Sequence, residues 1–164
     1  ARLGPHPPNF TTVAAVGLFA GTFFRRRWVA CAVPVLAVMF SDALIGVYTA
    51  AVMAAVYAGH LFPTLLGMGF SRKVTAWRVG AGAVAAAVVF FLTTNFAVWF
   101  SGVLYEPTAA GLLACYTSAL PFFQHTLLGN LFWCTVIFGG YAFVGRWAAH
   151  LQDRELRPAP VKIR

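Results

Sequence analysis

The feature that most constrains this chain is a succession of five apolar runs, each separated from the next by a short polar or basic stretch. Hydrophobic residues make up 60% of the 164 residues and charged residues only 10%, whereas soluble domains are nearer half apolar and a quarter charged. A small soluble domain cannot bury this much apolar surface. The sequence therefore predicts an all-α fold, a polytopic transmembrane helical bundle in a lipid bilayer.

The apolar runs set the predicted spans. They cover residues 11–24, 28–46, 47–70, 76–100 and 121–147. The first is short for a bilayer, which takes about 20 residues to cross. Between the last two runs, residues 101–120 mix apolar side chains with glycine and proline, which favours a short re-entrant or interfacial helix. We expect one transmembrane domain over residues 1–147 and a polar tail over residues 148–164.

The start of the chain is unusual for a complete membrane protein. It begins at Ala1 rather than Met, and Pro5, Pro7 and Pro8 disfavour helix there. We therefore expect a processed or shortened chain, with a sixth helix or a transit segment upstream. The membrane is then a bacterial inner membrane, or an organellar or thylakoid membrane if a transit segment was removed.

The basic residues predict an orientation. The net charge is +8, and Lys and Arg cluster beside the apolar runs, as at Arg25–Arg27 and Arg72-Lys73. If the spans alternate in direction, every Lys and Arg except Arg2 lies on one side, which the positive-inside rule assigns to the cytoplasm or stroma. The positive-inside rule thus explains the net positive charge, and we do not expect nucleic-acid binding.

Polar side chains inside the apolar runs are the candidates for function. An ionised side chain at mid-bilayer costs about 2.5–3.5 kcal/mol on insertion scales, so such residues face the bundle interior. Under the predicted orientation several of them converge on the outer leaflet. The candidates for contact with a small polar ligand are Asp42, Asn95, Tyr116, Gln124, His125 and Asn130. A hydrogen-bond network that only joins helices explains the same pattern equally well.

Other residues carry weaker signals. Gly17 and Gly21 form a GxxxG pair, used either for packing within the chain or for docking to a partner's helices. His60, His125 and Asn95 are candidates for holding a metal or a pigment, with chlorophyll or carotenoid as the cofactor in that case. Nucleophile elbow, HExxH, P-loop and dinucleotide motifs are all absent, so we expect a protein that is not an enzyme.

Three stretches carry a resemblance to a known family. They are Pro5-His6-Pro7-Pro8-Asn9-Phe10-Thr11, Thr94-Asn95-Phe96-Ala97-Val98-Trp99, and Tyr105-Glu106-Pro107-Thr108 with the residues that follow as far as Phe123. Together with Ser41-Asp42 they resemble an uncharacterised family of small membrane proteins, a domain of unknown function. The resemblance implies one more helix before the Pro-rich segment. It also implies Gly-Asp where this chain has Gly129-Asn130, which removes an acidic ligand at that position.

That family is similar in architecture to the substrate-binding S components of energy-coupling factor vitamin transporters. The similarity implies six helices, a ligand pocket near the outer face, and docking of small residues such as Gly17 and Gly21 on a partner subunit. We therefore expect a subunit that captures a small polar ligand for transport. The alternative is an accessory structural subunit of a larger photosynthetic or respiratory membrane complex. Both interpretations include other membrane subunits as partners.

Overall fold

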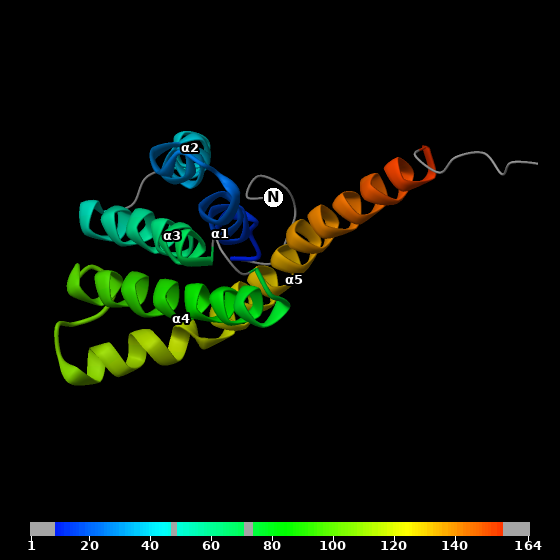
Figure 1. Ribbon diagram of the computed structural model, residues 1–164. Helices are drawn as coiled ribbons and strands as arrows, with labels where there is room; N and C mark the ends of the chain where they lie inside the picture. Colours follow the sequence, from blue (N-terminus) through cyan, green and yellow to red (C-terminus); the bar gives the residue numbers. More distant parts are fainter. Residues whose placement is uncertain (1–8, 47–48, 71–73, 156–164) are drawn as a thin grey trace, which may run out of the picture.

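The computed structural model describes residues 9–46, 49–70 and 74–155, and every structural statement below concerns these residues. This part of the chain is all-helical, which confirms the predicted fold class (Figure 1). Its helices are α1 (Val13–Phe23), α2 (Arg27–Ile45), α3 (Ala50–Phe70), α4 (Ala76–Phe100) and α5 (Ala109–Glu155). Four of them, α2 to α5, are long and apolar enough to cross a membrane.

Helix α1 differs from the other four in length. Its 11 residues extend about 17 Å at 1.5 Å per residue, roughly half of a hydrocarbon core about 30 Å thick. The described residues before it, 9–12, are not helical. The predicted span at 11–24 therefore contains a short helix preceded by a non-helical segment.

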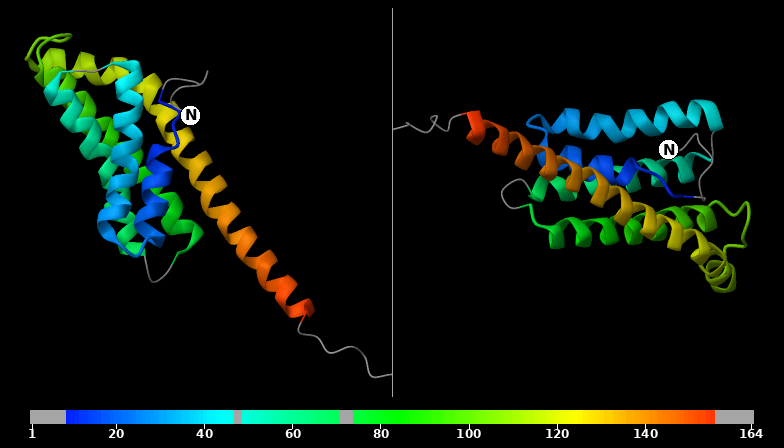
Figure 2. Two further views of the ribbon diagram at one scale, coloured as in Figure 1. Left: turned by 90° about the horizontal axis from the view of Figure 1, so that it is seen from above. Right: turned by 90° about the vertical axis from the view of Figure 1, so that its right-hand side faces the viewer.

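The short helix α1 lies at the centre of the bundle and packs against each of the other four helices (Figure 2). Seven of its 11 residues are buried, although its sequence is mostly small and apolar on every side. A helix that is hydrophobic all round is expected to be surrounded by protein or lipid. Here the other helices surround it, and Leu18 of α1 joins Val79 and Ala83 of α4 and Phe138 of α5 in one apolar cluster.

Glycines allow α1 to approach α3 at backbone distance. A Cβ atom at Gly21 would overlap the carbonyl oxygen of Thr64, and a Cβ atom at Gly67 would overlap that of Leu18. At Gly17 the nearest atom to such a Cβ would be the Thr64 hydroxyl, at 2.8 Å. The GxxxG pair of α1 therefore packs within the chain, against α3.

Helix α5 is longer than expected. It contains both the short helix expected within residues 101–120 and the span expected at 121–147, and Pro121 lies inside it. Figure 2 shows that the first part of α5 runs at an angle to the rest. An internal proline removes one backbone hydrogen bond and bends a helix, and neighbouring helices make this tolerable in a membrane. The first part packs against α4: the Tyr116 hydroxyl donates to the Leu92 carbonyl at 2.7 Å, and the Tyr116 ring contacts that of Phe91.

The second half of α5 leaves the bundle (Figure 1). All residues from 139 to 153 are exposed, and the helix continues to Glu155. The predicted tail at 148–164 therefore begins as helix, and residues 156–164 lie outside the described part of the chain.

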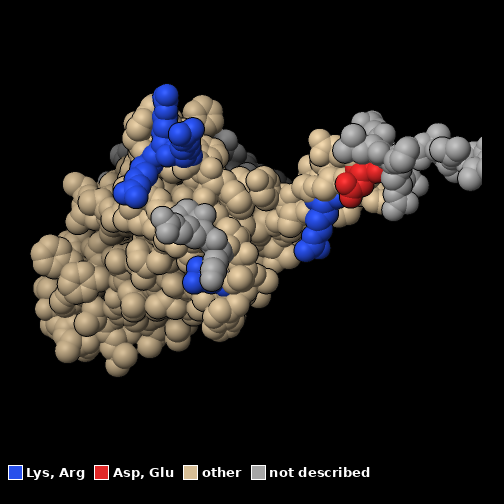
Figure 3. Space-filling view, in the orientation of Figure 1, with Lys and Arg blue, Asp and Glu red and all other residues tan. Residues whose placement is uncertain are grey.

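The basic residues Arg25–Arg27, Arg78 and Arg146, which the structure describes, lie at one end of the bundle. Helices α1 and α3 run parallel, so the α1–α2 link with Arg25–Arg27 and the link before α4 are at the same end. Tyr141 of α5 contacts Phe23 at the end of α1, with ring centroids 4.4 Å apart, so Arg146 is also at this end. Figure 3 shows basic side chains from these elements on one face of the molecule.

Candidate functional site

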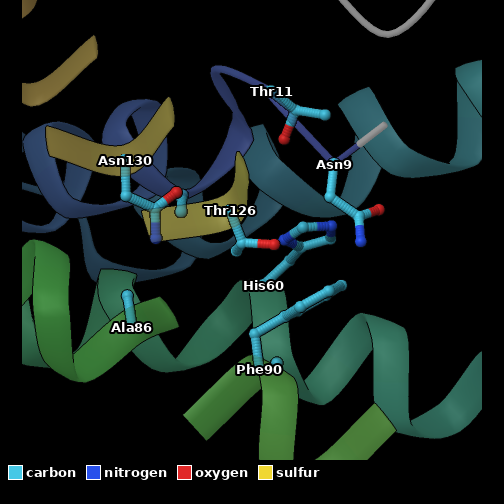
Figure 4. Close-up of a pocket in the computed structure, with 9 residues that line it drawn as sticks. Asn9, Thr11, His60, Ala86, Phe90, Thr126 and Asn130 are labelled. Atoms are coloured by element: carbon cyan, nitrogen blue, oxygen red, sulfur yellow. The ribbon is translucent and has the colours of Figure 1, made fainter. Parts of the chain in front are cut away.

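The candidate functional site is a small polar cavity inside the bundle (Figure 4). It measures about 40 Å³ and lies between the segment before α1 and helices α1, α3, α4 and α5. It is lined by Asn9, Thr11, Ala14, Gly59, His60, Ala86, Phe90, Thr126 and Asn130. One water needs about 10–15 Å³ of such space, so the cavity suits a few waters or a very small ligand.

The segment before α1 forms one wall. Asn9 has φ 63°, in the left-handed region, which asparagine tolerates better than most residues. The Thr11 N–H donates to the Asn9 carbonyl at 3.0 Å, which closes a tight turn, and the Thr12 side chain does not cap α1. Non-helical backbone is tolerated at membrane depth only where it is buried in protein or lines a cavity. This segment lies beside such a cavity.

Helices α3 and α4 supply a stacked pair of rings. His60 of α3 is 7% exposed, and its ring stacks on Phe90 of α4 with centroids 4.9 Å apart. Gly59 makes room for this pair, because a Cβ atom there would lie 2.8 Å from the Phe90 ring. The imidazole is thus held against an aromatic wall at the edge of the cavity.

Helix α5 supplies a hydroxyl and an amide one turn apart. The Thr126 hydroxyl donates to the Phe122 carbonyl at 3.0 Å; in Figure 4 its oxygen points towards the His60 ring. Asn130 is 3% exposed. Its amide nitrogen donates to the Ala83 carbonyl of α4 at 3.2 Å, and its amide oxygen is turned away from α4 (Figure 4). Asn130 therefore joins two helices and keeps an acceptor towards the cavity.

A second hollow of about 100 Å³ adjoins the first and shares Asn9, Phe90 and Thr126 with it. Asn95 lines this second hollow, and its amide nitrogen donates to the Phe91 carbonyl of its own helix at 2.8 Å. The two hollows are therefore neighbours, and both lie between α4 and α5.

The structure divides the six residues predicted for ligand contact. Asn130 lines the central cavity and Asn95 the adjoining hollow. Tyr116 donates its hydroxyl to the α4 backbone and so joins helices. The other three residues line neither hollow. Asp42 is buried in α2. On α5, Gln124 is exposed and His125 is half-buried.

The cavity also includes residues that the sequence did not single out as ligand contacts. Asn9, Thr11 and Thr126 belong to it, and His60 was expected only as a pigment or metal ligand. Thr126 and Asn130 are four residues apart, so they lie on the same helix face. Once Asn130 is chosen as a site residue, this spacing identifies Thr126 as another. No comparable spacing signal identifies Asn9, whose position depends on the turn before α1.

The cavity lies near the middle of the helices that enclose it. His60 lies ten residues from each end of α3, and Asn130 is opposite Ala83, well inside α4. The span expected at 121–147 would place Asn130 within its first ten residues. Because α5 begins at Ala109, Asn130 lies instead about 30 Å along it.

The space beside the histidine bears on the expected cofactors. The described residues contain no group of three or more His, Cys, Asp or Glu side chains that could hold a metal ion. The buried ring of His60 adjoins a cavity of about 40 Å³, which has no room for a pigment macrocycle. Asn95 adjoins a hollow of about 100 Å³ and is restricted in the same way, whereas His125 lines neither hollow.

Comparisons with known proteins place the chain in a family. Neither the curated proteins nor the solved structures give a match. A family model described as a family of unknown function (DUF6580) matches residues 1–153, which include every residue that lines the central cavity. The chain therefore belongs to this family of unknown function, as a member with several apolar, membrane-type helices.

Proposed function

We propose that this protein is a non-catalytic membrane subunit that captures a small polar ligand in the central cavity, for transport driven by partner proteins. The observation that supports this is the gathering of His60, Thr126 and Asn130, from two helices, beside the Asn9 turn at mid-helix depth. Polar groups are costly inside a bilayer, and those that face a bundle interior commonly mark substrate pathways.

The chemistry of the lining selects the ligand class. Hydroxyl, amide and imidazole groups can donate and accept hydrogen bonds, and among the described residues no Asp, Glu, Lys or Arg lines the cavity. The uncapped start of α1 adds backbone N–H groups and a partial positive charge. The favoured ligand is therefore a small uncharged or anionic molecule. Broken or shortened membrane helices bind anionic substrate groups in this way.

The S components of energy-coupling factor transporters remain the architectural comparison for this proposal. Like them, the chain lacks a nucleotide-binding motif, so the energy would come from partner ATPases. Since Gly17 and Gly21 are buried against α3, docking to a partner would use other surfaces, such as the exposed half of α5. In the proposed orientation the basic end faces the cytoplasm or stroma.

The test compares cavity variants with a matched variant on the same helix. Thr126→Val and Asn130→Ala remove hydrogen-bonding groups from the cavity, whereas Gln124→Ala changes an exposed polar residue nearby. We expect each cavity variant to lose about tenfold in ligand affinity, since a hydrogen bond contributes roughly 1–1.5 kcal/mol. Gln124→Ala should bind like the wild type.

The measurement is native mass spectrometry of the protein in mild detergent, followed by thermal-shift screening with small neutral and anionic metabolites. Melting of each variant shows whether it is folded. Folded cavity variants that retain the ligand as well as Gln124→Ala does would contradict the proposal. So would a wild type that neither carries nor is stabilised by any such molecule.

The exposed half of α5 favours a second candidate, an accessory subunit of a larger membrane complex. Phe143, Val144 and Trp147 are each more than half exposed there, and large exposed apolar patches commonly mark contacts with other proteins or with lipid. Isolation in mild detergent distinguishes the two candidates. Stoichiometric membrane subunits, or an absorption spectrum with pigment bands, would support the accessory role.

A further inference from the structure

A third and larger hollow lies at the basic end of the bundle, where α5 leaves the other helices. It measures about 560 Å³ and lies between the end of α1, the start of α4 and the second half of α5. Phe23, Val79, Leu131 and Phe138 make its wall mainly apolar. Glycines on both sides, Gly80 of α4 and Gly139 of α5, have nothing within 4 Å of where a Cβ would be, so small residues keep the groove wide.

Apart from Thr135, whose hydroxyl donates to the Leu131 carbonyl of its own helix, the polar side chains that line this groove lie towards its basic end. Arg146 and Thr75 both line it. Thr75 caps α4 by accepting a hydrogen bond from the Arg78 N–H at 3.3 Å. The start of α4 adds the partial positive charge of a helix N-terminus, and the described residues that line the groove include no Asp or Glu. The groove thus combines an apolar body with one positively charged end.

We propose that this groove binds one anionic phospholipid. Its phosphate lies between Arg146 and the start of α4, and an acyl chain extends along Phe23, Val79 and Phe138. Arginine forms strong charge-assisted hydrogen bonds to phosphate, and basic pockets between membrane helices bind anionic lipid headgroups. The groove shares no lining residue with the polar cavity, so this inference is independent of the proposed function.

The shape and charge of the groove favour a lipid as its occupant. Its apolar wall leads to one positively charged end that contains Arg146. An extended acyl chain can follow the apolar wall while an anionic headgroup meets the charged end.

The test measures lipid retention by native mass spectrometry after purification from membranes or nanodiscs that contain phosphatidylglycerol and phosphatidylcholine. Wild-type protein should retain one phosphatidylglycerol in preference to phosphatidylcholine. Arg146→Gln should lower the bound fraction about fivefold, the factor that corresponds to the attraction of one basic residue for an anionic surface. Gly139→Leu, which fills the groove with a side chain, should displace the lipid.

Arg26→Gln is the matched control, because Arg26 is exposed at the same end of the bundle but does not line the groove. It should retain the lipid like the wild type. Equal losses in Arg146→Gln and Arg26→Gln would overturn the proposal, because they would indicate attraction to the whole basic end. Equal retention of the two lipids would also overturn it. A third result would also overturn it: wild-type protein that binds no lipid but co-purifies with a membrane protein, which Gly139→Leu no longer binds.

Discussion

Two glycine-rich contacts in this protein have opposite consequences. Where α1 meets α3, Gly21 and Gly67 bring backbone against backbone, and a Cβ atom at either position would overlap a carbonyl oxygen. Where α4 faces α5, Gly80 and Gly139 border open space. A glycine in a helix costs about 1 kcal/mol relative to alanine. Close packing offsets that cost in the first contact, whereas in the second the glycines leave a groove.

The largest effect is expected from alanine at the α1–α3 contact. Gly21→Ala or Gly67→Ala forces the two backbones apart, and overpacking of this kind typically costs about 1–3 kcal/mol. Because α1 is at the centre of the bundle, the effect should spread to every helix that packs against it. Thermal or SDS-induced unfolding in detergent measures the loss.

Gly139→Ala is the control for these variants, since it places the same methyl group in open space. If Gly21→Ala unfolded at the same temperature as Gly139→Ala, the close approach of α1 to α3 would be wrong. If Gly67→Ala lost ligand from the central cavity but kept its stability, that result would still contradict the close approach.

An intermediate effect is expected at Gly17, where the obstacle is a side chain. A Cβ atom there would lie 2.8 Å from the hydroxyl oxygen of Thr64, which is fully buried and has no hydrogen-bond partner among the described residues. Gly17→Ala should therefore destabilise less than Gly21→Ala. Removing the hydroxyl with Thr64→Ala should relieve the clash.

A double-mutant cycle of Gly17→Ala and Thr64→Ala checks this explanation. We expect a favourable coupling of about 0.5 kcal/mol or more, as for residues in direct contact. Strictly additive losses of stability would show that the two side chains do not meet.

The smallest effect is expected in the groove itself. Gly139→Ala should leave stability unchanged or raise it by up to about 1 kcal/mol, because alanine favours helix and meets no atom within 4 Å. The melting temperature in detergent measures this change. A clear destabilisation would mean that α5 packs more closely against α4 than the groove allows.

The site was less predictable than the fold, and particular residues show why. Asn130 was identified because an amide in an apolar run is unusual, and it does line the cavity. Gln124 was chosen for the same reason, yet it is exposed, because it lies on another face of α5. The type of a residue indicates how costly it is to bury in a membrane. It does not indicate whether the residue lies on the helix face that is turned towards the cavity.

The sequence by itself determined that this is an all-α protein with long apolar helices, and where most of those helices begin and end, because hydropathy and charge act locally along the chain. Only the tertiary structure decided that α1 is central, that α5 continues through Pro121, and that Asn9, His60 and Asn130 share a cavity. These features depend on how closely helices approach and in which register they pack. Side chains far apart in the sequence set that geometry together.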